Sequence, residues 1–206
     1  MLRDNGLTIA LMALFLLTIA AMGLTGWKAH NASLGEHGAA PLGLIAYLGS
    51  GDFASAVFEN WESEFLQMAA YVILTAFLFQ RGSAESRDPE GKADEPEDAA
   101  PAARGLLHLL YAYSLGIALA ALFVGSFLLH LWGSFRAAAA EAALHGGAQH
   151  TLAAHLGEMQ FWFESFQNWQ SEFLATAALV VLSIVLRFRG SPESKHVRAS
   201  NAETGR

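Results

Sequence analysis

Residues 58–66 read Phe-Glu-Asn-Trp-Glu-Ser-Glu-Phe-Leu, and residues 166–174 read Phe-Gln-Asn-Trp-Gln-Ser-Glu-Phe-Leu. A constant shift of 108 positions, without a gap, superposes the second stretch on the first. The same shift pairs the apolar run that begins at Leu7 with the run that begins at Leu115. Because repetition at a fixed period is typical of duplicated structural units, the sequence predicts a tandem duplication.

Each predicted repeat contains two apolar runs that are long enough to cross a membrane. A hydrocarbon core of about 30 Å is crossed by roughly 17 to 25 helical residues. The composition agrees, since 53% of the 206 residues are hydrophobic and only 15% are charged. We therefore expect an all-α integral membrane protein with four transmembrane helices, in the runs 7–27, 61–80, 106–132 and 169–186.

The duplication predicts the domain organisation. Repeat 1 takes residues 1–82 and repeat 2 takes residues 105–190, and residues 191–206 form a tail. Residues 83–104 mix Pro, Gly, Ala and acids without apolar periodicity, which predicts a flexible acidic linker. Because each repeat crosses the membrane twice, the repeats share one orientation and are parallel, unlike inverted repeats.

The distribution of lysine and arginine predicts the orientation. Of the 12 basic residues, only Lys28 and Arg136 lie in the two segments between the paired spans. The positive-inside rule therefore predicts that both termini and the linker are cytoplasmic. The two outer segments are expected to carry interfacial helices, one of which begins at Arg136 and ends before Gly146. An Arg-Gly-Ser-x-Glu-Ser motif occurs at Arg81 and again at Arg189. We expect it to end the second helix of each repeat.

The repeated motif supplies the candidate functional or interfacial cluster. Its members are Asn60, Trp61, Glu64, Asn168, Trp169 and Glu172. One interpretation is structural: the asparagines cap helices, the carboxylates lie near positive helix ends and the tryptophans join an aromatic belt. The other is functional, because Asn and Glu stand four apart on one helix face, and two facing repeats would pair them to bind a cation or relay protons.

The depth of the glutamates favours an interfacial position. From Glu64 to Gln80 the helix rises about 24 Å, which places the carboxylate about 6 Å inside the outer boundary of a core of about 30 Å. Such a position suits the mouth of a pathway or an interfacial network better than a central transport site.

Metal, haem and filter sites have weaker support. His37 and His145 are repeat-equivalent and each is followed by glycine. His145, His150 and His155 do not share one helical face, and the last two have no counterparts in repeat 1, so a metalloprotein that binds metal through the His37 and His145 pair is only a third interpretation and we assign no metal ligand. His108 and His130 lie near opposite ends of one span, which disfavours haem. The glycine-rich residues 48–52 have no counterpart in repeat 2, which argues against a selectivity filter. We expect no cofactor.

No catalytic signature occurs in the sequence. The absence of cysteine excludes thiolate chemistry, and no nucleophile–base pair or phosphate loop is recognisable. We therefore predict a non-enzymatic membrane protein, an accessory or scaffold subunit whose partners are the lipid bilayer and either further copies of itself or a membrane complex, with no nucleic acid. The alternative is a small ion or proton channel or carrier that uses Glu64 and Glu172 at its outer mouth.

The doubled Asn-Trp-x-Ser-Glu-Phe-Leu motif, the His-Gly pairs at His37 and His145 and the Gly-Ser-Pro-Glu-Ser-Lys stretch at 190–195 also carry a resemblance. With them the chain resembles an uncharacterised bacterial family of small, duplicated four-helix membrane proteins known only as a domain of unknown function. The resemblance covers nearly the whole chain except the linker. It implies a bacterial cytoplasmic (inner) membrane location and the same duplicated fold, and it brings no assigned activity, cofactor or catalytic residue.

Overall fold

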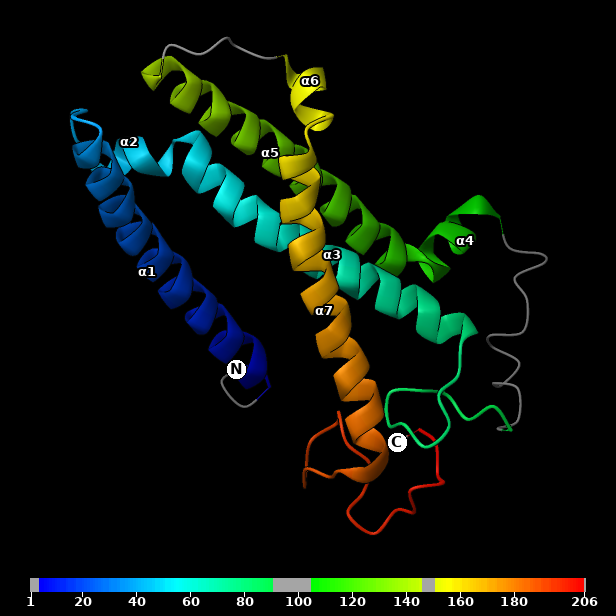
Figure 1. Cartoon of the computed structure of the whole chain (residues 1–206). Coiled ribbons are helices and arrows are strands. Elements are labelled where there is room, and N and C mark those ends of the chain that lie inside the picture. Colours follow the sequence, from blue (N-terminus) through cyan, green and yellow to red (C-terminus); the bar gives the residue numbers. More distant parts are fainter. Residues whose placement is uncertain (1–3, 91–104, 146–150, 206) are drawn as a thin grey trace. The chain divides into compact units, whose positions relative to one another are not determined.

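The computed structural model describes residues 4–90, 105–145 and 151–205, and all regular secondary structure in this part of the chain is α-helical (Figure 1). The helices are α1 (Gly6–Glu36), α2 (Leu44–Leu48), α3 (Gly51–Phe77), α4 (Leu106–Ala112), α5 (Ser114–Leu144), α6 (Leu152–Leu156) and α7 (Met159–Val185). The predicted all-α class is therefore confirmed for the described residues.

Three of these helices, α1, α5 and α7, are long and apolar enough to cross a membrane, which indicates a multi-pass membrane protein. The predicted span 61–80 falls largely in α3, which has 27 residues like α7. The first half of α3 carries Asp52, Glu59, Glu62 and Glu64, and these acids lower its mean hydropathy. A fourth span in α3 stays a prediction.

The helices extend beyond the predicted runs. α1 continues to Glu36, and α5 continues to Leu144 as one helix that includes the predicted outer helix at Arg136. The alanine-rich residues 137–143 favour the continuation of α5, because alanine has the highest helix propensity. The predicted span 106–132 is divided at Tyr113, where α4 ends and α5 begins.

Helix bounds recur along the chain. α1, α2 and α3 contain 31, 5 and 27 residues, and α5, α6 and α7 contain the same numbers in the same order. The bounds of each pair differ by 108 positions. Both short helices, α2 and α6, lie in the segments that were predicted to be on the outer side.

The chain divides into two compact units, each built from two stretches of sequence. The first unit takes residues 1–58 and 129–157, and the second takes residues 59–128 and 158–206. α3 and α5 each contribute to both units, and the units are described separately below.

In the first unit, the start of α3 and the second half of α5 approach each other closely at two glycines. A Cβ atom on Gly133 would lie 2.6 Å from the backbone nitrogen of Ser55, and one on Gly51 would lie 2.4 Å from that of Ala137. Small residues that let helix backbones approach are typical of helix packing in membrane proteins. These two glycines therefore set the spacing of α3 and α5 in this unit.

The segment before α2 is held against α1 by hydrogen bonds to Leu42. The side-chain amide of Asn31 donates to the carbonyl of Leu42 (2.9 Å) and its oxygen accepts from the Leu42 amide (2.8 Å), and Trp27 Nε1 donates to the same carbonyl (2.7 Å). In α2, Tyr47 is buried and its ring packs on Phe53. Burial raises the pKa of Tyr47, and the negative charge of Asp52 raises it further.

In the second unit, α3 and α7 are each followed by the same turn. α3 ends at Phe77 and α7 at Val185, in each case before the arginine motif that was predicted to end it. The amide of Gln80 donates to Ser86 Oγ (2.8 Å), and the amide of Phe188 donates to Ser194 Oγ (2.9 Å). The glycine of each turn has a left-handed backbone, with φ of 83° at position 82 and 84° at position 190, which L side chains rarely adopt.

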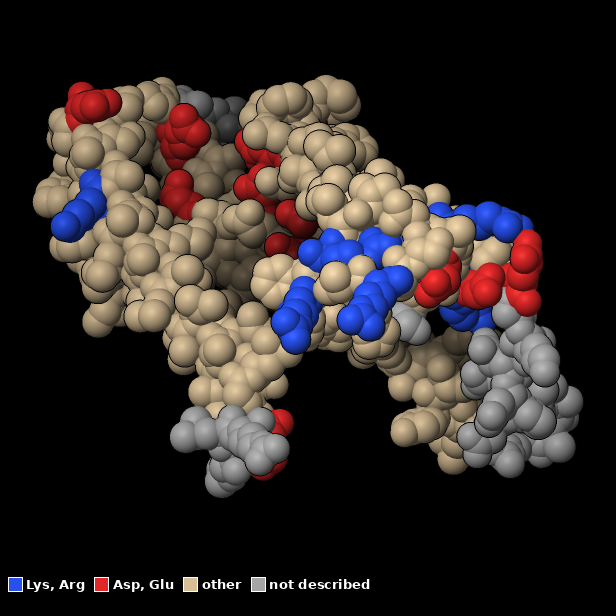
Figure 2. Space-filling model, turned by 90° about the horizontal axis from the view of Figure 1, so that it is seen from below, with Lys and Arg blue, Asp and Glu red and all other residues tan. Residues whose placement is uncertain are grey.

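The C-terminal segment folds around the first of these turns. Lys195 is 3% exposed, and its ammonium donates to the carbonyls of Gly82, Ser200, Asn201 and Glu203. Burial lowers the pKa of Lys195, with Arg187 adding to the effect and Glu203 opposing it. Figure 2 views the molecule from the side on which this segment lies and shows lysine and arginine side chains gathered there.

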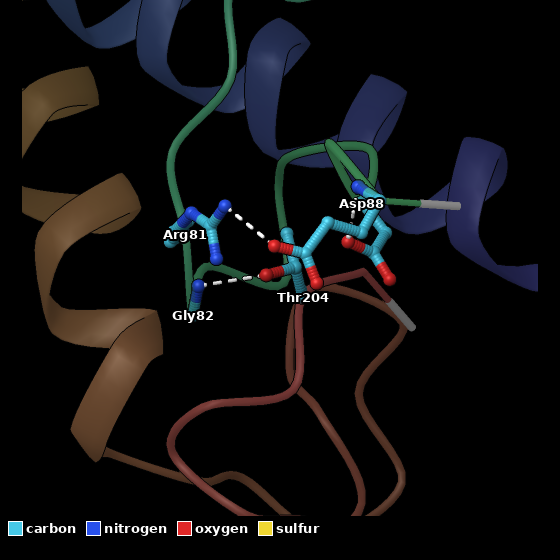
Figure 3. A network of polar contacts seen from close by, with 5 residues as sticks. Arg81, Gly82, Asp88 and Thr204 are labelled. Carbon is cyan, nitrogen blue, oxygen red and sulfur yellow. Dashed lines mark hydrogen bonds and ion pairs between the residues drawn. The ribbon is translucent and has the colours of Figure 1, made fainter.

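A further hydrogen bond joins the segment after α3 to the C-terminal segment, because the amide of Gly82 donates to Thr204 Oγ1 (2.9 Å) (Figure 3). Within the segment after α3, Arg81 forms an ion pair with Glu90 (2.7 Å). The ion pair is exposed and contributes little stability. Residues 83–90, the start of the predicted linker, thus form turns against the C-terminal segment, and the rest of that linker lies outside the described residues.

The contact at Gly133 gives the first prediction. Gly133→Ala should lower the free energy of unfolding by about 1–3 kcal/mol, because the new methyl group overlaps the backbone of α3. Thermal unfolding followed by tryptophan fluorescence in detergent measures the effect.

Gly125→Ala is the matched control, since a Cβ atom there meets no other heavy atom within 4 Å. It should be neutral or stabilising by up to about 1 kcal/mol, because alanine is the better helix former. Equal effects of the two substitutions would contradict the close approach at Gly133.

Candidate functional site

Side-chain hydrogen bonds join α3 to α7 within the second unit. Asn168 Nδ2 donates to Glu59 Oε1, and Trp169 Nε1 donates to Glu62 Oε1 at 3.2 Å. Further along, Gln67 Nε2 donates to Thr176 Oγ1. These six residues are called the α3–α7 polar seam. Hydrogen bonds between helices are one of the interactions that hold membrane helices together.

The seam fixes the direction and register of the two helices. In each bonded pair the residue numbers differ by 107 to 109, and both numbers rise together along the helices. Antiparallel helices would give numbers that change in opposite directions. α3 and α7 are therefore parallel, and positions 108 apart in sequence face each other.

Two predicted site residues, Asn168 and Trp169, belong to the seam. Neither asparagine of the repeated motif caps a helix, so this expectation was wrong. α3 begins at Gly51 and α7 at Met159, which places Asn60 and Asn168 inside their helices. Asn60 is exposed, and its backbone carbonyl accepts from Ser63 Oγ at 2.8 Å.

Glu64 in α3 and Glu172 in α7 belong to the same helix pair. Their carboxylates are near enough for their negative charges to repel each other. Glu64 is exposed and Glu172 is half-buried, as is Trp61. The structure therefore brings together the two glutamates that the repeated motif predicted to be paired.

The carboxylate acceptors of the seam, Glu59 and Glu62, were missed as site residues. Glu62 is fully buried. In the second repeat the equivalent positions are Gln167 and Gln170. The Glu-to-Gln differences within an otherwise matching motif were the available signal, because they mark polar positions where the repeats need different chemistry.

A cavity continues from the seam along α3 and α7. Its volume is about 390 Å³, and Gln67, Tyr71, Glu85 and Thr176 are among the polar residues that line it. The Tyr71 hydroxyl donates to Glu85 Oε2 at 2.8 Å. A water molecule occupies about 30 Å³ of liquid, so the cavity has room for several.

Trp169 of the repeated motif packs against two other aromatic rings in this unit. The ring of Trp169 lies 5.3 Å from Phe166 and 6.0 Å from Phe123, both in edge-to-face geometry. Such contacts contribute about 0.5–1.5 kcal/mol each beyond area burial. They support a packing role for Trp169 in addition to its hydrogen bond.

The described residues contain no group of three or more His, Asp or Glu side chains placed to hold a metal ion. Two histidines are buried in the first unit, His130 in α5 and His155 in α6. His155 Nε2 lies 2.9 Å from Ser134 Oγ, which also donates to the Leu131 carbonyl. Both side chains are buried, so this contact lies in the interior of the first unit.

The seam gives a prediction for stability. Gln67→Leu and Thr176→Val should each destabilise the protein, and a double-mutant cycle should give a coupling of about 0.6 kcal/mol, up to about 1.7 kcal/mol. Thermal or denaturant unfolding in detergent measures the free energy of unfolding of the wild type, the two single variants and the double variant.

Thr25→Val serves as the control partner in a second cycle with Gln67→Leu, because the Thr25 hydroxyl donates to Ala21 of its own helix. That cycle should show no coupling. A coupling near zero for the first pair would contradict the hydrogen bond between α3 and α7.

The chain belongs to the family described as a domain of unknown function, DUF6766, whose sequence profile matches residues 1–206. The resemblance to a family of unknown function is thus confirmed. No curated protein and no solved structure matches the chain.

Proposed function

We propose that this member of the DUF6766 family is a bacterial cytoplasmic-membrane protein in which α3 is a fourth span and two parallel repeats place both termini in the cytoplasm. The matching lengths and bounds of α3 and α7 support a duplicated unit. Their parallel register supports a shared orientation. Within the second unit, the segments after both helices carry arginines, as the positive-inside rule requires of a cytoplasmic face.

Within that architecture, the activity that the geometry supports best is movement of protons or small cations along the α3–α7 interface. The observation that carries this proposal is a series of polar side chains that follows the interface. The series begins with Glu64 and Glu172, continues through Gln67 and Thr176 and ends with Tyr71 hydrogen-bonded to Glu85.

The free-energy cost of placing polar side chains in a membrane supports a functional role for this series. Ionisable and amide side chains are expensive in a hydrocarbon core, and they are usually found where they line ion or proton pathways. From Glu64 to Tyr71 α3 rises about 10 Å, so the groups are spread along the helix rather than gathered at one level. The cavity beside them has room for water that can bridge the gaps.

Tyr71 and Glu85 have no equivalents as a pair in the second repeat. Leu179 stands at the position that corresponds to Tyr71, whereas Glu193 corresponds to Glu85. Only the first repeat therefore carries the Tyr71–Glu85 pair that completes the series. Glu193, in the equivalent turn of the second repeat, can serve as an internal control for Glu85.

A non-enzymatic accessory or scaffold subunit is the second candidate, and the seam itself favours it. Asn168, Trp169 and Gln67 each donate a hydrogen bond to a side chain of the other helix, and such bonds are typical of helix association in membranes. In this case the protein would act through a further copy or a membrane complex and would move no ions.

Proton flux into proteoliposomes, followed by an entrapped pH-sensitive dye under a potassium diffusion potential, separates the candidates. Glu85→Gln and the double substitution Glu64→Gln plus Glu172→Gln should each lower the flux about tenfold or more, because each removes a proton-accepting group from the series. Glu193→Gln should leave the flux at the wild-type level, although it lies in the equivalent turn.

Two results would contradict the pathway. One is a wild-type flux no greater than that of protein-free vesicles in which a protonophore still produces a signal. The other is an equal loss in Glu85→Gln and Glu193→Gln, since this would indicate a general effect of the turn. Either result would favour the accessory subunit.

A further inference from the structure

A second cavity, in the first unit, collects ionisable side chains that the proposed pathway does not use. Its volume is about 650 Å³, and it lies among the end of α1, the start of α3 and the end of α5. The ionisable residues that line it are His30, His37, Asp52, Arg136, Glu141 and His145.

Two repeat-equivalent histidines meet at this cavity. The rings of His37 and His145 lie 5.3 Å apart between centroids, at an interplanar angle of 78°. One follows the end of α1 and the other the end of α5. Their approach is built by the ends of two long helices rather than by one helical face, which is why their spacing in sequence did not indicate it.

The hydrogen bond of His37 prepares its ring for a ligand. Its Nδ1 lies 2.8 Å from the carbonyl oxygen of Ser33. A carbonyl only accepts hydrogen bonds, so Nδ1 carries the proton and Nε2 presents a lone pair. Metal-binding histidines typically have this arrangement, in which a backbone carbonyl fixes the tautomer through the other ring nitrogen.

The distance between the rings fits a shared metal ion. Imidazole nitrogens bind Zn²⁺ at about 2.0–2.1 Å with tetrahedral angles, which separates the centroids of two ligating rings by about 5 Å. The observed 5.3 Å agrees with that value.

The charge of the cavity adds to this fit. Glu141 lies one helical turn before His145 and lines the same cavity, as does Asp52. Arg136 is held over the Trp132 ring at 4.8 Å and donates to the Gly49 carbonyl. Two carboxylates against one guanidinium leave the cavity with a net negative charge, which attracts cations.

We propose that His37 and His145 bind a divalent late transition-metal ion, such as Zn²⁺ or Cu²⁺, in this cavity. Imidazole is a preferred ligand of these ions. Because no group of three His, Asp or Glu side chains is assembled among the described residues, water completes the coordination. The site is independent of the proposed pathway and needs no ion movement along α3 and α7.

The test uses the full-length protein in lipid nanodiscs, stripped with a chelator and titrated with Cu²⁺. Electron paramagnetic resonance should show one ion per chain with hyperfine splitting from two imidazole nitrogens. His37→Asn and His145→Asn should each weaken binding about tenfold or more and reduce the count to one nitrogen. His108→Asn and His196→Asn, which lie in the second unit, should change neither.

Binding with two nitrogens that survives the double substitution of His37 and His145 would overturn the proposal. So would the lack of a stoichiometric ion at micromolar Cu²⁺ in the wild-type protein, in which case the rings only pack together. If the substitutions lower the helix content measured by circular dichroism, the electron paramagnetic resonance spectrum of the wild-type protein still tests the proposal. Hyperfine splitting from fewer than two imidazole nitrogens in that spectrum would contradict the site.

Discussion

The interaction on which the second unit depends is the pairing of α3 with α7 through the α3–α7 polar seam. Contacts between apolar side chains alone fix the register of two helices only weakly in a membrane, because lipid tails are as apolar as leucine and there is no hydrophobic driving force between the helices. Hydrogen bonds between specific side chains remove that freedom. Glu62 is fully buried and accepts from Trp169, so a shift of one residue would leave both groups badly paired.

The register set by the seam determines what lies at each level of the helix pair. It brings Glu64 beside Glu172 and, about two turns further along, places Tyr71 within reach of Glu85. The same register brings the turns after α3 and α7 to one end of the unit, where the Ser183 hydroxyl lies 2.9 Å from that of Ser83. The buried ammonium of Lys195 then ties the C-terminal segment to the first turn.

Much of this could be predicted from the repeated sequence. A shift of 108 positions predicted matching helices in the two halves of the chain, and it placed Glu64 and Glu172 at equivalent positions of closely similar motifs. The predicted runs 61–80 and 169–186 begin ten residues after the starts of α3 and α7, because an apolar run marks the length that crosses a membrane and not the whole length of a helix. The Tyr71–Glu85 bond could not be foreseen, because it depends on how the chain turns after α3.

The central claim is the parallel register of α3 and α7, and distances between spin labels test it most directly. The chain has no cysteine, so labels can be placed on Leu74→Cys with Leu182→Cys, and on Leu74→Cys with Phe163→Cys, all at exposed positions. Positions 163 and 182 are about 28 Å apart along α7. The account predicts that the 74–182 distance is shorter than the 74–163 distance by about 10 Å or more. The reverse order would mean that the helices are antiparallel and would contradict it.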